Sequence, residues 1–338
     1  MLGSLVGSFA AAEGAIRIWE AWRPAPERNP SGSNETTIIP DPDLGYRLRP
    51  NFGMHNADGL NGPPAGPKSD RFRVLVLGDS LIYGRNNVVS RTAEILAADA
   101  DLKPAEFLNA GVPGYTNYQE LIYLKQRGLA FQPDLVGVVF VLNDLHKFLH
   151  NPRFEGAAEG FDNRSEAALR SDRSLLGMAR RSRFLVWLRR NFKTSENFVR
   201  MVEERGYTFD YNPDFQTAWK EEPWSAIEAQ LGEMAGLGRS SRFGLFLVAM
   251  PYGEQFRKDY LARDYAYVTK PQRHLEQICR RLGIAYLDLF PALDPQRHMA
   301  RDRVHLTPAG RAVVAERTAA FLKSERLIPA RAGGTGKP

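Results

Sequence analysis

The sequence lacks the features that mark several common protein classes. Its 338 residues include one cysteine, Cys279, which excludes an intrachain disulfide framework and a cysteine-rich metal site. The formal net charge is +6, but there is no long basic run, internal repeat, zinc finger, helix-turn-helix or RNA-binding signature. We therefore expect no nucleic-acid partner. What remains is the composition of an ordinary globular protein, with 43% hydrophobic and 25% charged residues.

A long hydrophobic run is also missing from the N-terminus. The uncharged stretch Leu2–Ala12 is too short to span a bilayer, which takes a helix of about 20 residues. No basic segment typical of a secretory signal precedes it. Trp19 and Trp22 follow among arginines, a combination that suits a membrane–water interface. Residues 1–24 therefore predict either a helix packed on the domain or an association with a membrane surface.

The strongest local pattern is the stretch that ends at Ser80. Four aliphatic residues, Val74–Leu77, predict a strand buried on both faces, as in parallel sheets. The strand stops at Gly78-Asp79-Ser80, and open α/β sheets bind ligands at the carboxyl ends of their strands. Ser80 is therefore a candidate nucleophile. Its chemistry depends on whether the chain also supplies a base, an orienting acid and oxyanion donors.

Strands and helices alternate along the rest of the chain. Further strands are predicted at Glu106–Leu108, Leu135–Leu142, Gly244–Met250 and Ile284–Leu289. Helices are predicted to begin near Ser90, Asn117, Pro271 and Thr307. Thr307 is expected to cap the last helix, with a proline at its first position. The alternation predicts a three-layer α/β/α sandwich around a mostly parallel sheet.

Composition divides the chain into four parts. We expect an apolar N-terminal segment at 1–24, an extended arm at 25–72, a main domain at 73–322 and a flexible tail at 323–338. The arm is rich in proline, glycine and asparagine and is too long for a simple connection, so we expect it to wrap over the domain. The main domain is interrupted at 150–242 by a helical insertion, which is the natural place for a lid or a substrate-binding part.

The best candidate for the base is His305, in the loop between the last strand and the last helix. Asp302 stands three residues before it, so one turn can bring the carboxylate to the imidazole. The carboxylate would hold the ring in the tautomer that accepts a proton from Ser80. Donors for an oxyanion are expected from the Ser80 N–H and, at the next two strand ends, from the Gly114 N–H and the Asn143 amide.

These blocks resemble a known family. The blocks Gly78-Asp79-Ser80, Gly114, Asn143-Asp144 and Asp302–His305 are similar to the four sequence blocks of the SGNH, or GDSL, hydrolase superfamily. The resemblance implies a flavodoxin-like fold, with Ser80 as nucleophile, Asp302 and His305 completing a triad, and Ser80, Gly114 and Asn143 forming the oxyanion hole. It implies no metal and no organic cofactor. The chain departs from the family pattern at Val141, where the third block usually has glycine.

The resemblance implies a serine esterase that removes a short O-acyl group from a small molecule or a glycan through an acyl-enzyme. The alternatives are an O-acyltransferase acting on a polysaccharide, a lipid esterase and a catalytically silent glycan-binding protein. The arm and the apolar N-terminus are similar to a bacterial branch of the family with an N-terminal membrane segment. This predicts a location in the bacterial cell envelope, membrane-associated or periplasmic, with the cytoplasm as the alternative.

Overall fold

The centre of the molecule is a five-stranded parallel sheet. The computed structural model describes residues 11–18, 37–145, 182, 184, 206–212 and 214–331. The strands lie in the order β4-β3-β5-β6-β7, and every neighbouring pair is parallel. Their bounds are β3 Phe72–Gly78, β4 Ala105–Gly111, β5 Leu135–Val141, β6 Gly244–Met250 and β7 Ala285–Asp288. The expected parallel sheet is confirmed, and its strand order is the flavodoxin-like one.

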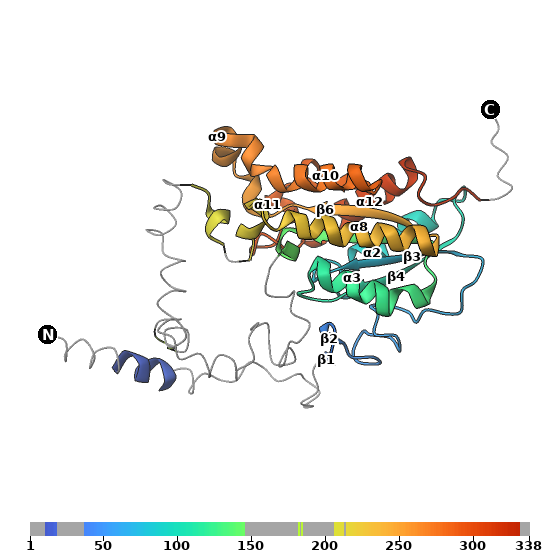
Figure 1. The fold of residues 1–338 in the computed structure, drawn as a ribbon, viewed down its shortest axis with the longest axis horizontal. Helices are drawn as coiled ribbons and strands as arrows, with labels where there is room; N and C mark the ends of the chain where they lie inside the picture. Colours follow the sequence, from blue (N-terminus) through green and yellow to red (C-terminus); the bar gives the residue numbers. More distant parts are fainter. Residues whose placement is uncertain are drawn as a thin grey trace.

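Helices cover both faces of this sheet (Figure 1). On one face, α2 (Val88–Ala97) packs against α12 (Pro308–Ser324). On the other, α8 (Trp224–Ser241) packs against both α3 (Asn117–Gln126) and α10 (Lys270–Leu282). The predicted three-layer α/β/α sandwich is confirmed. The predicted cap at Thr307 is also confirmed, since its side chain accepts from Gly310 N at 3.1 Å, whereas α2 begins earlier than predicted, with Asn87 rather than Ser90 as its cap.

The core lies on both sides of the sheet because its strands are apolar on both faces. All seven residues of β5 are buried. Gly137 in this strand makes room for a neighbouring ring, since a Cβ there would lie 2.3 Å from Cζ of Phe246. Cys279 is buried on α10, as expected, and burial raises the pKa of its thiol to about 12.

Short helical elements connect these layers. They are η1 (Gly128–Phe131), η2 (Leu142–Leu145), η5 (Thr208–Tyr211), η6 (Gln216–Trp219), η7 (Gly253–Phe256), α9 (Lys258–Val268), η8 (Phe290–Ala292) and α11 (Pro295–His298). The predicted insertion at 150–242 ends with α8, which is the crossover helix between β5 and β6. Most of the insertion before residue 206 lies outside the described residues.

The described part of the arm contains a hairpin that the sequence did not predict. Strands β1 (Ile38–Asp41) and β2 (Gly45–Leu48) pair antiparallel. The arm then bonds to the last residue of β4 and to the loop after it. Tyr46 Oη donates to the Pro113 carbonyl at 2.8 Å, and Asn61 Nδ2 donates to the Gly111 carbonyl at 2.8 Å. The arm thereby reaches the edge of the sheet where polar side chains gather.

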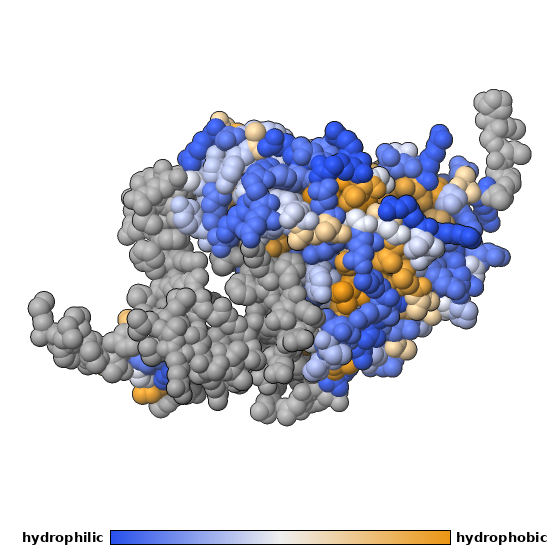
Figure 2. Space-filling model, viewed as in Figure 1, coloured by the Kyte–Doolittle hydropathy of each residue, from blue (hydrophilic) through white to orange (hydrophobic). Residues whose placement is uncertain are grey.

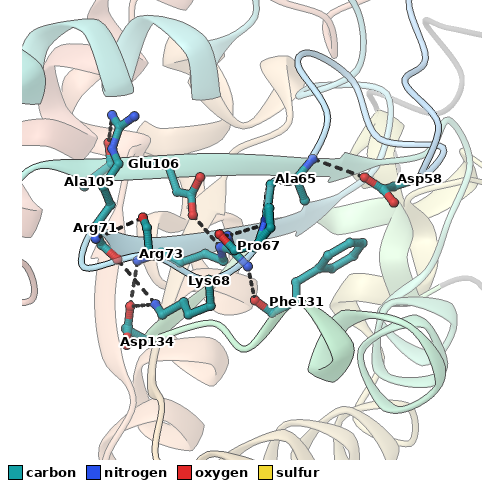
Figure 3. Close-up of polar contacts among 12 residues, drawn as sticks. Asp58, Ala65, Pro67, Lys68, Arg71, Arg73, Ala105, Glu106, Phe131 and Asp134 are labelled. Atoms are coloured by element: carbon teal, nitrogen blue, oxygen red, sulfur yellow. Dashed lines mark hydrogen bonds and ion pairs between the residues drawn. The ribbon is translucent and has the colours of Figure 1, made fainter.

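A buried arginine anchors the arm at the opposite end of β3 (Figure 3). The Arg73 side chain is 3% exposed. Its Nε donates to Glu106 at 2.5 Å, Nη1 donates to the Phe131 carbonyl at 2.5 Å, and Nη2 donates to the Gly66 carbonyl at 2.8 Å. Its backbone N–H donates to Asp134 at 2.7 Å, and Lys68 pairs with the same carboxylate.

The N-terminal segment is described only over residues 11–18, which form a helix. Glu13 pairs with Arg17 on this helix and also accepts from Ser182 Oγ and Phe184 N, both at 2.8 Å. Trp19 and Trp22 lie outside the described residues, as does the tail from residue 332. Across the part of the chain that is described, every helix is too short or too polar to cross a membrane.

The face of the molecule in Figure 2 is mainly hydrophilic, with hydrophobic residues in the seams between the helices.

Candidate active site

The parallel sheet brings the candidate site residues to one edge. Ser80 comes just after β3, Gly114 follows β4, and Asn143 lies in η2 directly after β5. Asp302 and His305 lie in the loop that precedes α12. Because the strands are parallel, their carboxyl ends meet at the same edge, where ligands bind in this class of fold.

Three of these residues form a continuous hydrogen-bonded chain. Ser80 Oγ lies 2.9 Å from Nε2 of His305, and Nδ1 of His305 lies 2.7 Å from Oδ2 of Asp302. With the ring proton on Nδ1, the imidazole donates to the carboxylate and accepts from the serine hydroxyl. About half of each partner is open to solvent, with side-chain exposures of 49% for His305 and 51% for Asp302. The geometry is that of a nucleophile, a base and an orienting acid.

The loop that carries Asp302 and His305 is held by hydrogen bonds within itself. Asp302 Oδ1 accepts from Val304 N at 3.0 Å and from His305 N at 2.9 Å. Arg303, between them, has a φ of 64°, in the left-handed region that non-glycine residues rarely adopt. Ala300 closes the turn, since its N–H donates to the His305 carbonyl at 2.7 Å and its carbonyl accepts from Arg303 N at 3.0 Å.

The same hydrogen bonds favour the ionised form of Asp302. Partial burial opposes the charged form of the carboxyl, but hydrogen bonds from the Val304 N–H, the His305 ring and the His305 N–H outweigh it. The pKa of Asp302 is therefore lowered below its ordinary value. The carboxylate stays charged at neutral pH and can stabilise an imidazolium on His305.

A glycine outside the predicted blocks supports this loop. Gly253 N, in η7, donates to the Arg303 carbonyl at 2.8 Å. A Cβ at position 253 would lie 2.7 Å from Cβ and 2.8 Å from the carbonyl oxygen of Arg303. The strained residue between Asp302 and His305 therefore rests directly on a glycine backbone. The sequence analysis missed this contact, because Gly253 and Arg303 come from separate loops.

Gly114 lies in a turn clamped by the arm. Its φ is 77°, a conformation that favours glycine, and Tyr115 N donates to the Val112 carbonyl at 3.1 Å across the turn. Tyr46 donates to the Pro113 carbonyl and, through its own carbonyl, accepts from Tyr115 Oη at 2.7 Å. The backbone at Gly114 is thus fixed in advance, as an oxyanion donor requires.

Asn143 and Ser80 are linked through Asp79, which the sequence analysis did not include in the site. Asp79 is 1% exposed, and burial raises the pKa of its carboxyl. Hydrogen bonds from the Leu81 N–H, at 2.9 Å, and from the Asn143 side chain oppose that rise. A carboxylate only accepts, so the Asn143 amide is the donor in this bond and retains a second N–H hydrogen.

The described residues contain no group of three or more His, Cys, Asp or Glu side chains arranged to hold a metal ion.

Comparison with known proteins agrees with the blocks in the sequence. Residues 76–313 match the model of the GDSL-like lipase/acylhydrolase family. A search of curated proteins gave no match. Among solved structures, a lipase/acylhydrolase from Enterococcus faecalis is 15% identical, with a TM-score of 0.45, and the alignment covers 77% of this chain and 98% of that one. An acetylxylan esterase from Geobacillus stearothermophilus is 16% identical, with a TM-score of 0.44 and coverages of 74% and 94%.

Proposed function

Because this chain belongs to the GDSL-like lipase/acylhydrolase family, and is therefore a hydrolase acting on ester bonds, we propose that it is a serine esterase with Ser80 as its nucleophile. The observation that carries the proposal is the hydrogen-bonded chain from Ser80 through His305 to Asp302. A serine hydroxyl becomes nucleophilic when a neighbouring base accepts its proton and that base is held in place.

The proposed reaction has two halves. Ser80 Oγ attacks the ester carbonyl while His305 Nε2 takes its proton, and Asp302 stabilises the resulting imidazolium. The N–H groups of Ser80 and Gly114 and the Asn143 amide stabilise the oxyanion. His305 then protonates the leaving alcohol, which departs and leaves an acyl group on Ser80. Water, deprotonated by His305, hydrolyses this ester and frees the serine.

We propose a short O-acyl group on a glycan as the substrate. Half of the His305 and Asp302 side chains is exposed, so a bulky alcohol component can reach the serine. An open, polar edge of this kind suits a hydrophilic polymer better than a long apolar acyl chain, which needs a pocket that removes it from water.

The test is a substrate panel. We expect hydrolysis of p-nitrophenyl acetate to exceed that of the butyrate and octanoate esters, together with release of acetate from an O-acetylated polysaccharide. Each assay is repeated with a non-acetylated oligosaccharide as acceptor. Turnover only with the acceptor would favour the O-acyltransferase, a preference for octanoate would favour a lipid esterase, and no turnover with any ester would favour a silent glycan-binding protein.

For residues 1–24 we propose association with the bacterial cell envelope. Ile18, in the N-terminal helix, is 61% exposed, and two tryptophans and an arginine follow it in the sequence. Deleting residues 1–24 should release the protein from membranes and leave hydrolysis of a soluble ester unchanged. If the intact chain already fractionates away from membranes, the segment is a packing helix, held through contacts such as those of Glu13.

A further inference from the structure

Three carboxyl side chains are buried together next to the candidate site. Asp79, Glu120 and Asp144 are 1%, 1% and 0% exposed. They come from the end of β3, the first turn of α3 and η2, and α3 packs against both of the other elements. The proposed mechanism uses Asp79 through its bond to Asn143, but it gives no role to Glu120 or Asp144.

The hydrogen-bond donors around these carboxyls are too few. Asp79 accepts from the Leu81 N–H, and Asp144 Oδ2 accepts from Val141 N at 2.7 Å. The other oxygens, Asp144 Oδ1, Asn143 Oδ1 and both carboxyl oxygens of Glu120, are buried and find no donor among the described residues. A buried acceptor without a donor is costly, and a buried carboxylate without one costs more.

No cation in the described part of the chain compensates these carboxyls either. Lys125 and Arg127 lie at the far end of α3 and pair with Glu233 and Asp41. From α8, Gln230 accepts from Asn117. From the arm, the Leu44 carbonyl accepts from Gln119. Among the described residues, the charges that act on Glu120 and Asp144 are therefore those of the two carboxyls themselves and of Asp79, which in turn feels the charge of His305.

We propose that Glu120 and Asp144 share a proton, and that the resulting acid pair is a positioning device for Asn143. The O–H of one carboxyl donates to an oxygen of the other and supplies a donor that the cluster lacks. Since Asp144 also holds the Val141 N–H, the pair fixes the turn from the end of β5 into η2, which carries Asn143. Glu120 and Asp144 are positioning residues, and this role rests on the proposed oxyanion function of Asn143.

The electrostatics agree with a protonated pair. Burial raises the pKa of Glu120 well above its ordinary value, and the negative charge of Asp79 adds to the rise. Burial likewise raises the pKa of Asp144, followed by the charges of Glu120 and Asp79. Two carboxylates in one buried site cannot both be ionised without strong repulsion, so one proton stays at neutral pH.

The sign of the pH dependence follows. The unfolded chain releases the proton at the ordinary carboxyl pKa, about 4.3 for glutamate, whereas the folded chain keeps it to higher pH. The unfolded state therefore binds fewer protons between these two pKa values, and stability falls as pH rises through that window. Above the raised pKa of the pair, both carboxyls are charged, the turn loosens and kcat falls.

The variants Glu120→Gln and Asp144→Asn separate this role from a merely structural one. Each replaces a carboxyl with an amide, which supplies a permanent N–H donor. We expect either variant to keep kcat within about threefold of wild type at neutral pH. Each should also lose the alkaline fall in kcat and flatten the decline of Tm with pH. Glu94→Gln, at an exposed carboxyl on α2, is the matched control and should change none of these.

Infrared spectroscopy of the resting protein reads the proton directly. At neutral pH the wild type should show the C=O band of a protonated carboxylic acid, and Glu120→Gln or Asp144→Asn should remove it. The proposal of a shared proton is wrong if the wild type lacks this band or if the band survives both substitutions. It is also wrong if kcat still falls at alkaline pH in both variants. Failure of the esterase mechanism would show instead as full activity in Ser80→Ala and would leave the infrared band in place. If one variant does not fold, the other gives the same reading.

Discussion

The two ends of β3 bury charge in opposite ways. At the amino end, Arg73 is matched by one carboxylate and several backbone carbonyls, and its side chain is nearly sealed from water (Figure 3). At the carboxyl end, Asp79, Glu120 and Asp144 are equally buried, but oxygens of the last two have no donor among the described residues. One end satisfies its polar groups and the other leaves some of them unsatisfied.

This difference between the two ends of β3 corresponds to two roles: the amino end stabilises the fold, and the carboxyl end carries the proposed chemistry. A fully bonded buried arginine joins β3, β4 and the arm, and it offers nothing to a substrate. The opposite end carries the serine–histidine pair together with a left-handed Arg303 and a group of buried acids, and the last two features cost stability. Substitutions at the carboxyl end should therefore reduce activity more than stability, and those at the amino end should do the reverse.

The largest effect is expected from Ser80→Ala. Loss of the nucleophile should lower kcat by about 10⁴–10⁶-fold and leave Tm nearly unchanged, because a strand-end hydroxyl adds little to the core. A serine-directed phosphonate should label the wild type at Ser80 alone. The same change at Ser90 on α2 is the control and should leave kcat intact. Full activity in Ser80→Ala would remove Ser80 as nucleophile.

Arg73→Met tests the other end of the strand. It keeps most of the side-chain volume but removes the charge, which leaves Glu106 and the Gly66 and Phe131 carbonyls without their donor. We expect a loss of about 3–5 kcal/mol in the free energy of unfolding, measured by denaturant titration. The kcat of the folded fraction should not change.

Arg71→Met is the matched control for this experiment. Arg71 is two residues away but exposed, and it bonds only weakly to the Ala105 carbonyl, at 3.2 Å. Its substitution should cost less than about 0.5 kcal/mol. Equal losses for the two variants, or a fall in kcat for Arg73→Met, would show that the two ends of β3 are not functionally separate.

Asn143→Ala removes a donor proposed to act on the oxyanion. We expect kcat to fall by about 10²–10³-fold with little change in KM, because this hydrogen bond forms only as charge develops on the substrate oxygen. Steady-state kinetics on p-nitrophenyl acetate measures both constants. A change confined to KM would make Asn143 a contact for the bound substrate instead.

The parts of the fold and site that the sequence predicted are those set by local pattern. Buried strands such as Val74–Leu77 are predictable from their continuous apolar residues. Thr307 is predictable as a helix cap from its place before a proline. The approach of Ser80 to His305 was also predictable, because each follows a strand or precedes a helix at the same edge of a parallel sheet. The predicted start of α2 was wrong by a few residues, because Asn87 and Ser90 are both residues that can cap a helix.

The parts that the sequence did not predict depend on contacts between distant segments. Glu120 looks like an ordinary polar residue in a helix, and only the packing of α3 against β3 and η2 buries it beside Asp79 and Asp144. Likewise, the β1–β2 hairpin shows little periodicity, and its Tyr46 reaches the Gly114 turn across 67 positions of sequence. Local propensity carries no information about such pairings.

Gly253→Ala gives the smallest expected effect. It tests whether the contact between η7 and Arg303 is needed to hold Asp302 and His305 in place. The backbone at Gly253 does not need a left-handed φ, so the only obstacle to alanine is its contact with Arg303, at 2.7 Å from Cβ to Cβ. Relief of this contact should shift the Asp302–His305 turn and lower kcat by up to about 10²-fold, as small misplacements of catalytic groups do.

Gly236→Ala in α8 is the control, since its nearest new contact is a flexible arginine tip at 3.8 Å. It should leave kcat unchanged and leave Tm equal or slightly higher. If Gly253→Ala has wild-type kcat, the catalytic turn holds its shape without support from η7, and the Asp302 hydrogen bonds to Val304 and His305 suffice to fix the base.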